Sequence, residues 1–153
     1  MLRIVRTDST DPDFINLVKS LDAYLAEIDG DEHAFYAQLN KTDTLKNVVL
    51  VYEDNIPVGC GAFRAFENNV VEVKRMYTVP DYRGKGFASM VLSELEKWAE
   101  ELLVKKCVLE TGHRQPEAIN LYKKQGYKII PNYGKYAHVE NSVCFEKNLN
   151  NKS

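Results

Sequence analysis

The strongest constraint on the fold of this chain is a segment in which a strand pattern gives way abruptly to a helix pattern. Residues 70–79 have the apolar alternation of a strand, which a proline ends. Two glycines, Gly84 and Gly86, follow, and residues 86–103 then carry apolar side chains at helical spacing. A nearly apolar strand comes next at 107–111, so we expect a βαβ unit with a right-handed crossover.

Short strands and helices are predicted on both sides of this unit. Residues 2–6 favour a first strand, and Asp11 or Thr10 can cap a helix that has Pro12 in its first turn. We expect this helix to stop at residues 29–31. Its predicted apolar face consists of Phe14, Ile15, Val18, Leu21, Leu25 and Ile28. The other predicted elements are a short helix at 32–38, strands at 48–52 and 56–66, a helix from Pro116 to Gly126, and strands at 127–130 and 142–149.

This element order predicts an α+β fold with a mixed, largely antiparallel central sheet of about seven strands and about four helices. A length of 153 residues suits one domain, which we expect over 1–149, followed by a frayed polar tail at 150–153. No apolar run is long enough for a membrane-spanning helix. A formal net charge of −2 argues against a nucleic-acid partner.

The three cysteines indicate the redox compartment. Cys60, Cys107 and Cys144 all lie in apolar, strand-like runs, and their spacing fits neither a disulfide framework nor a metal site. We expect three buried small hydrophobic side chains, no bound metal, and a reducing cytoplasmic location.

The turn before the long helix has the features of a pyrophosphate-binding loop. Main-chain N–H groups at a helix start have no partner within the helix, and the helix dipole adds positive charge there. Glycines let the main chain approach phosphates closely, and Arg83 and Lys85 add charge. A tight turn that merely needs glycine explains Gly84 and Gly86 equally well.

Two other phosphate loops can be compared with this segment. A nucleotide-triphosphatase loop requires Lys-Ser/Thr after its last glycine, but Phe87 follows Gly86 here. A dinucleotide-binding loop fits better, because Ser89 nearly completes the glycine pattern and Glu110 lies where a ribose-binding acid belongs. Four residues separate the strand from Gly84, however, and the chain has a single βαβ unit, which weakens the dinucleotide interpretation.

Two linked motifs resemble those of the GNAT superfamily of N-acetyltransferases. The run Arg83-x-x-Gly86-x-Ala88 matches its coenzyme A signature Arg/Gln-x-x-Gly-x-Gly/Ala, and residues 73–80 look like its fourth strand. Residues 117–127 are similar to its second motif, in which a helix carries Asn and Tyr two residues apart before Gly and an aromatic residue. The resemblance covers about residues 3–149, with the specific motifs inside 70–130.

The resemblance implies acetyl-CoA as co-substrate and direct attack by a primary amine in a ternary complex. It also implies that the two parallel strands separate to form a splayed βαβ cofactor cleft. Main-chain groups near Tyr77 and Val79 would then pair with the pantetheine arm and face the thioester carbonyl. The cofactor-binding residues expected on this basis are Tyr77, Thr78, Val79, Arg83, Gly84, Lys85, Gly86, Phe87, Ala88, Asn120 and Tyr122.

The same resemblance supplies candidate catalytic residues. Tyr122 is the candidate general acid for the leaving thiolate, since a phenol and a thiol have comparable reference pKa values. Glu72 is the candidate base. Glu110, His113 or water are alternatives, and Glu72 could equally be a solvated strand charge.

The acceptor and the assembly are less constrained by the sequence. Superfamily members usually bind the acceptor with their first helices and C-terminal strands, which here offer Tyr24, Glu27, Tyr36, Gln38 and the loop 131–138. A small molecule or a peptide or protein amine would fit, and a homodimer is possible. Two other functions stay open: a non-catalytic acyl-CoA binding or sensing module, and a nicotinamide dinucleotide binder.

Overall fold

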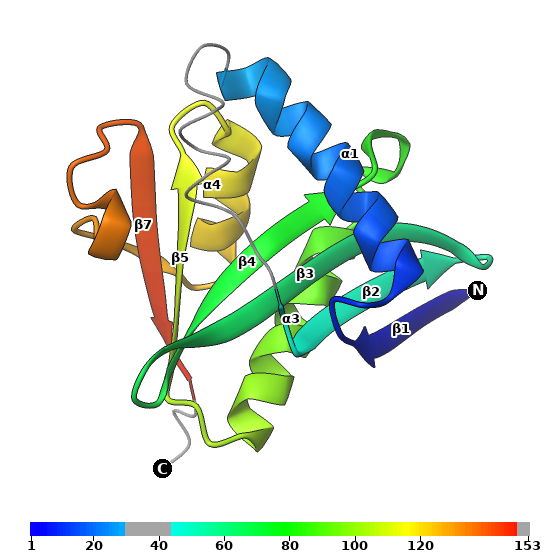
Figure 1. Cartoon of the computed structure of the whole chain (residues 1–153), viewed down its shortest axis with the longest axis horizontal. Helices are drawn as coiled ribbons and strands as arrows, with labels where there is room; N and C mark the ends of the chain where they lie inside the picture. Colours follow the sequence, from blue (N-terminus) through cyan, green and yellow to red (C-terminus); the bar gives the residue numbers. More distant parts are fainter. Residues whose placement is uncertain (30–43, 150–153) are drawn as a thin grey trace. The chain divides into compact units, whose positions relative to one another are not determined.

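The computed structural model describes residues 1–29 and 44–149, and Figure 1 follows the chain through its helices and strands. The short helix expected at 32–38, the candidate acceptor residues Tyr36 and Gln38, and the expected tail at 150–153 lie outside the described residues. The strands are β1 (Leu2–Thr7), β2 (Asn47–Glu53), β3 (Ile56–Glu67), β4 (Val70–Thr78), β5 (Lys106–Gly112), β6 (Lys128–Ile130) and β7 (Ser142–Asn148). The α-helices are α1 (Pro12–Asp29), α3 (Phe87–Glu101) and α4 (Pro116–Lys124), and the short 3-10 helices are η2 (Pro80–Tyr82) and η3 (Gly134–Tyr136).

The seven strands form one sheet in the order β1-β2-β3-β4-β5-β7-β6. Strands β4 and β5 run parallel, whereas β1 with β2, β2 with β3, β5 with β7 and β6 with β7 are antiparallel. The predicted mixed, largely antiparallel sheet is therefore confirmed, and α3 makes the expected crossover between the two parallel strands.

The chain divides into two compact units, which we describe separately. Unit 1 comprises Met1–Arg64 and Lys74–Leu95, and unit 2 comprises Ala65–Val73 with the chain from Glu96 onward. The expectation of a single domain over 1–149 stays a prediction.

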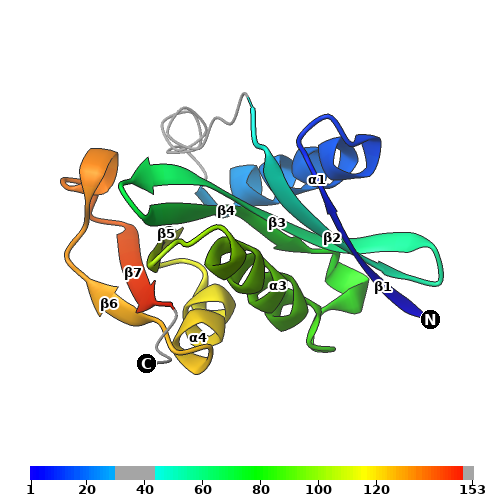
Figure 2. The same cartoon turned by 90° about the horizontal axis from the view of Figure 1, so that it is seen from below.

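Unit 1 has a helix on each face of its strands. Helix α1 packs on one face through a buried cluster that includes side chains of α1, β2, β3 and β4. The first part of α3 covers the opposite face, as Figure 2 shows. Gly61 of β3 lies close to side chains on that side, since a Cβ added there would meet Met76, Val91 and Leu95 at 3.0 Å or less. These strands are buried on both faces, which explains why β2 is almost continuously apolar.

Helix α1 begins as its sequence predicts. The Asp11 carboxylate accepts the main-chain N–H of Asp13 at 2.9 Å, and Pro12 is the first helical residue. The predicted apolar face needs one correction. Leu17 is buried and Ile15 is 42% exposed, because Phe14, Leu17 and Leu21 face the sheet at a spacing of three and four.

Helix α3 is shorter at its C-terminal end than predicted. It stops at Glu101, and Leu103 adopts a left-handed conformation with φ 67°. Leu102 and Leu103, which the helical pattern placed on the apolar face, are therefore exposed. The buried residue after this turn is Val104, which leads into β5.

Strand β4 contains a local irregularity that its sequence does not reveal. Arg75 has φ 60°, a left-handed conformation that is rare for a residue with a long side chain. Its carbonyl accepts from the buried Cys60 thiol at 3.3 Å, and its guanidinium forms an ion pair with Asp22 of α1 at 2.8 Å. Contacts with β3 and α1 thus hold Arg75 in this conformation.

Unit 2 is built around the antiparallel pair β5 and β7. Helix α4 ends at Lys124, and Gly126, with φ 93°, reverses the chain into β6 as expected for a C-terminal glycine. Cys107 of β5 and Cys144 of β7 are buried free thiols, as is Cys60 in unit 1, in agreement with the sequence analysis. Within residues 1–29 and 44–149, no helix is both long and apolar enough to span a membrane.

The contact at Gly61 generates a stability prediction. A Cβ at this position would lie 2.5 Å from Met76 Sδ and 2.8 Å from Val91 Cγ1, so Gly61→Ala should lower the free energy of unfolding by about 1–3 kcal/mol. Gly112→Ala is the matched control, because a Cβ there has its nearest neighbour at 3.4 Å. Urea unfolding measures both variants, and equal stability of the two would contradict the packing described here.

Candidate functional site

The loop between β4 and α3 has the geometry of an anion-binding helix start. The chain leaves η2 at Tyr82 and passes through Gly84 and Gly86, whose φ values of 80° and 86° are left-handed. The Gly86 carbonyl accepts the Met90 N–H at 3.1 Å, so Gly86 caps α3. A Cβ added at either glycine would have no neighbour within 4 Å, which means that open space, not packing, surrounds both positions.

The main-chain donors of this loop have no acceptors in the described part of the chain. No hydrogen bond joins the N–H groups of Gly84, Lys85, Gly86, Phe87 or Ala88 to any residue within 1–29 or 44–149. The loop is exposed up to Gly86, and the helix dipole adds positive potential at the same point. This arrangement can hold a phosphate or a diphosphate.

Both cations of the loop lie over aromatic rings. Arg83 donates from Nε to the Thr78 carbonyl at 2.9 Å, and its Cζ is 4.6 Å from the centre of the Tyr24 ring and 5.6 Å from that of Tyr77. Lys85 Nζ lies 5.3 Å from the centre of the Tyr82 ring. Tyr24, which the sequence analysis offered for the acceptor, contacts the loop residue Arg83.

The main chain at the end of β4 is hydrogen-bonded within the protein. Val79 donates its N–H to the Val58 carbonyl at 2.9 Å and accepts the Tyr82 N–H at 2.8 Å. Both main-chain groups of Val79 are therefore engaged, because the chain turns sharply into η2 at this residue. The Val79 carbonyl has a second lone pair, so it can still accept a hydrogen bond from a ligand, whereas the N–H of Val79 is already used. Tyr77 is buried, and burial raises the pKa of its phenol.

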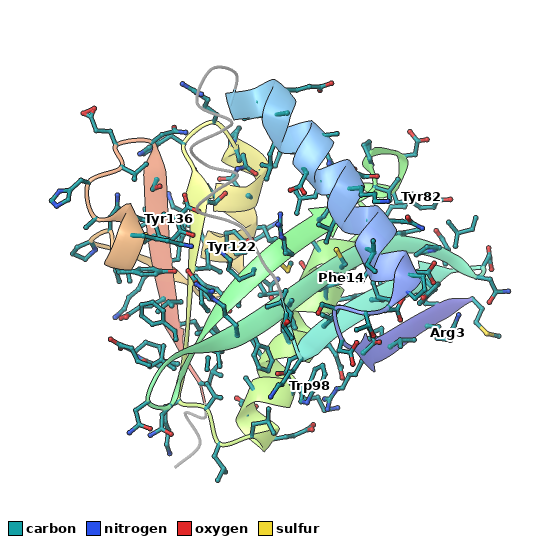
Figure 3. The ribbon with its side chains drawn as sticks, viewed as in Figure 1. Arg3, Phe14, Tyr82, Trp98, Tyr122 and Tyr136 are labelled. Atoms are coloured by element: carbon teal, nitrogen blue, oxygen red, sulfur yellow. The ribbon has the colours of Figure 1, made fainter. Side chains whose placement is uncertain are left out.

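In unit 2, Tyr122 is a buried phenol whose hydroxyl has no hydrogen-bond partner among the described residues. Its ring packs against Tyr127 and Phe145, at 5.9 and 5.7 Å between ring centres. Figure 3 shows Tyr122 on α4, beside β5. Burial, followed by the negative charge of Glu110, raises the pKa of Tyr122 and keeps the hydroxyl protonated. An unpaired buried hydroxyl is costly, and this one requires an explanation.

Glu72 is only 1% exposed, so it is not a solvated strand charge. Tyr133 donates its hydroxyl to Glu72 Oε2 at 2.8 Å, and burial together with the Glu72 carboxylate raises the pKa of Tyr133. Phe66 and Tyr136 contact the Tyr133 ring edge to face, at 5.0 and 5.7 Å between centres. Sequence reasoning placed Tyr133 only in a loop of aromatic residues. Its partner is 61 positions away in the chain, so no local signal could have revealed the bond.

The remaining candidates in unit 2 are less enclosed. Ser142 donates to Glu110 Oε2 at 2.7 Å, so Glu110 is held by a neighbouring strand. Asn120 and His113 are exposed. The ladder between β4 and β5 ends at Glu72 and Val108, before either strand ends, as the expected separation of these strands requires.

Proteins with similar sequences identify the family. The model of the Acetyltransferase (GNAT) family matches residues 13–127. The chain belongs to this family. An IAA acetyltransferase from Azospirillum brasilense is 31% identical over 138 residues, which cover 88% of this chain and 90% of the relative. The recognition made from the two sequence motifs is therefore confirmed.

Solved structures agree with the GNAT assignment. A proposed acyl-CoA N-acyltransferase from Klebsiella pneumoniae has a TM-score of 0.81 and 31% identity, covering 97% of this chain and 98% of the other. The PaiA N-acetyltransferase from Thermoplasma acidophilum, solved in complex with coenzyme A, shares the GNAT fold with a TM-score of 0.68 and 18% identity. That alignment covers 97% of this chain and 99% of the other.

The bond between Tyr133 and Glu72 generates a prediction for this GNAT protein. Tyr133→Phe removes a donor to a buried carboxylate and should lower the free energy of unfolding by about 1–3 kcal/mol. Tyr82→Phe is the control, because the Tyr82 hydroxyl has no hydrogen bond within the described residues. Chemical denaturation measures both. If Tyr133→Phe is as stable as Tyr82→Phe, the bond adds nothing to stability.

Proposed function

We propose that this GNAT protein is an N-acetyltransferase that takes the acetyl group from acetyl-CoA and transfers it to a primary amine by direct attack in a ternary complex. The observation that carries the proposal is the helix start at Gly84–Ala88, where main-chain donors without acceptors in the described chain, two left-handed glycines and two cations coincide. Coenzyme A in the PaiA structure supports the choice of cofactor. An assay of thiol release over an amine panel, with mass detection of the acetylated product, tests it.

In this proposal, unit 1 supplies the groups that hold the cofactor's phosphates. The N–H groups from Gly84 to Ala88 would bind the diphosphate, and Arg83 and Lys85 would neutralise its charge. Tyr77, Thr78 and Val79 remain the candidates for main-chain contacts with the pantetheine arm. Asn120 of unit 2 is an exposed amide that would donate to the same arm.

Tyr122 is the proposed general acid. The cofactor supplies an activated thioester, so the chain needs no covalent nucleophile, and its residues must instead orient the amine and protonate the leaving thiolate. The Tyr122 hydroxyl is protonated and has no partner within the described residues, so it can donate to a group that enters the site, although burial, by raising its pKa, makes it a weaker acid toward a thiolate than a free phenol. The raised pKa also means that this acid stays protonated as the pH rises past 10.

Glu72 is the proposed base for the attacking amine, held in one orientation by Tyr133. Glu110, which accepts from Ser142, and water are the alternatives. The acceptor class, a small-molecule or peptide amine, and a homodimer belong to the same proposal. The cytoplasm is the proposed location, because three free thiols in apolar interiors fit a reducing compartment.

A charge placed at Gly86 tests the cofactor site. Gly86→Glu should abolish coenzyme A binding in calorimetry, because the new carboxylate would repel the diphosphate. Gly86→Gln is the matched control, since it imposes the same backbone strain at φ 86° without the charge and should bind more tightly than the Glu variant. Coenzyme A affinity of wild-type strength in Gly86→Glu would place the diphosphate elsewhere.

Removal of the Tyr122 hydroxyl tests its proposed role as the general acid. Tyr122→Phe should lower kcat by about a hundredfold or more while leaving the Kd of coenzyme A within about twofold. The same variant should be as stable as the wild type or more stable, because the lost hydroxyl is buried without a partner in the described chain. Steady-state kinetics and thermal unfolding measure the two effects. An unchanged kcat removes Tyr122 from the mechanism, and tight binding without any turnover favours an acyl-CoA sensing module.

A further inference from the structure

The guanidinium of Arg83 lies against two aromatic rings that come from two different elements of unit 1. Tyr24 is on α1 and Tyr77 is on β4, and the Arg83 Cζ is 4.6 and 5.6 Å from their ring centres. We propose that Tyr24, together with Tyr77, is a positioning residue that holds Arg83 in place for the cofactor's diphosphate. This inference rests on the proposed function and extends it to a helix outside the coenzyme-binding motif.

The contacts of Arg83 leave its remaining donors available for an anion. Nε donates to the Thr78 carbonyl at 2.9 Å, and no other hydrogen bond or ion pair of the Arg83 side chain exists within residues 1–29 and 44–149. The ring contacts are not hydrogen bonds to an acceptor atom, so the two terminal nitrogens keep donors for an anion. Arg83 is exposed, which allows a phosphate to reach those donors.

Tyr24 can act in this way because the core fixes it. Its side chain is half-buried against the cluster that contains Phe14, Leu17 and Leu21. Its ring is 6.4 Å from that of Tyr77, with 56° between the ring planes. The two rings thus restrict the guanidinium of a long side chain that would otherwise sample many rotamers.

This restriction should appear as cofactor affinity. Ordering an arginine side chain on binding costs conformational entropy, and a guanidinium that is already in place avoids part of that cost. The N–H donors of Arg83 would also be in position before the diphosphate binds. Tyr24 would therefore strengthen coenzyme A binding without contacting the cofactor itself.

A double-mutant cycle on coenzyme A affinity tests the proposal, with Kd measured by calorimetry. Tyr24→Leu should weaken binding by about two- to fivefold, the range for a cation over an exposed ring, whereas Tyr24→Phe should stay within about twofold of the wild type. Arg83→Ala should weaken binding by about tenfold or more. In the Arg83→Ala background, Tyr24→Leu should change the Kd no further.

Steady-state kinetics give a second readout that a purely structural role would not produce. Tyr24→Leu should raise the KM for acetyl-CoA and leave kcat unchanged. If Tyr24→Leu melts at a lower temperature than the wild type, the measurement is repeated with Tyr24→Met. Methionine has no ring, and its side chain is comparable in volume to that of leucine.

Two results would overturn the proposal. One is wild-type affinity in both Tyr24→Leu and Tyr24→Met. The other is an equal loss of affinity from Tyr24→Leu with and without Arg83, since Tyr24 would then act independently of that guanidinium. Wild-type protein that fails to bind coenzyme A refutes the proposed function as well, whereas wild-type binding with additive losses refutes the role of Tyr24 alone.

Discussion

The burial of the unit 1 strands on both faces is the constraint on which the proposed cofactor site depends. Because α1 and the first part of α3 cover opposite faces of the same strands, the chain must turn from the end of β4 onto the face opposite α1 before α3 begins. The connection runs through η2, and Gly84 and Gly86 then turn the chain through left-handed conformations into the helix. Packing in the core therefore decides where main-chain donors face the solvent, and a place for a diphosphate follows from that arrangement.

The sequence predicts most of the fold because periodic burial leaves a local signal. Asp11 and Pro12 at the start of α1, and Gly126 after α4, mark helix ends that the structure reproduces. The predictions of the buried face of α1 and of the end of α3 were wrong where the local sequence pattern does not determine the conformation or the packing. Leu17 lies three residues after Phe14 and four before Leu21, so it fits the helical spacing, but the spacing alone does not decide whether the edge with Leu17 or the edge with Ile15 packs on the sheet. The end of α3 was missed because a leucine there adopts a conformation that usually requires glycine.

For the candidate site, too, some features could be predicted from the sequence and others could not. The loop from Arg83 to Ala88 is a contiguous motif, so its residues could be named from the sequence. Other features depend on residues that are distant in the chain. They are the bond from Tyr133 to Glu72, the position of Arg83 over Tyr24, and the bond from the Val79 N–H to Val58. The backbone of β4 shows the same limit, because side chains from β3 and α1 hold its left-handed residue in place.

The solitary hydroxyl of Tyr122 has a consequence for how this protein can evolve. The Tyr122 side chain is buried against aromatic rings, and its hydroxyl has no partner within the described residues, so this hydroxyl lowers the stability of the fold and phenylalanine would restore it. A single nucleotide change converts a tyrosine codon into a phenylalanine codon. Laboratory selection for heat resistance alone should therefore favour Tyr122→Phe, whereas the proposed role of Tyr122 as the acid implies that selection for turnover retains the phenol. Among related proteins, phenylalanine at this position would then indicate selection for stability, and tyrosine would indicate selection for turnover.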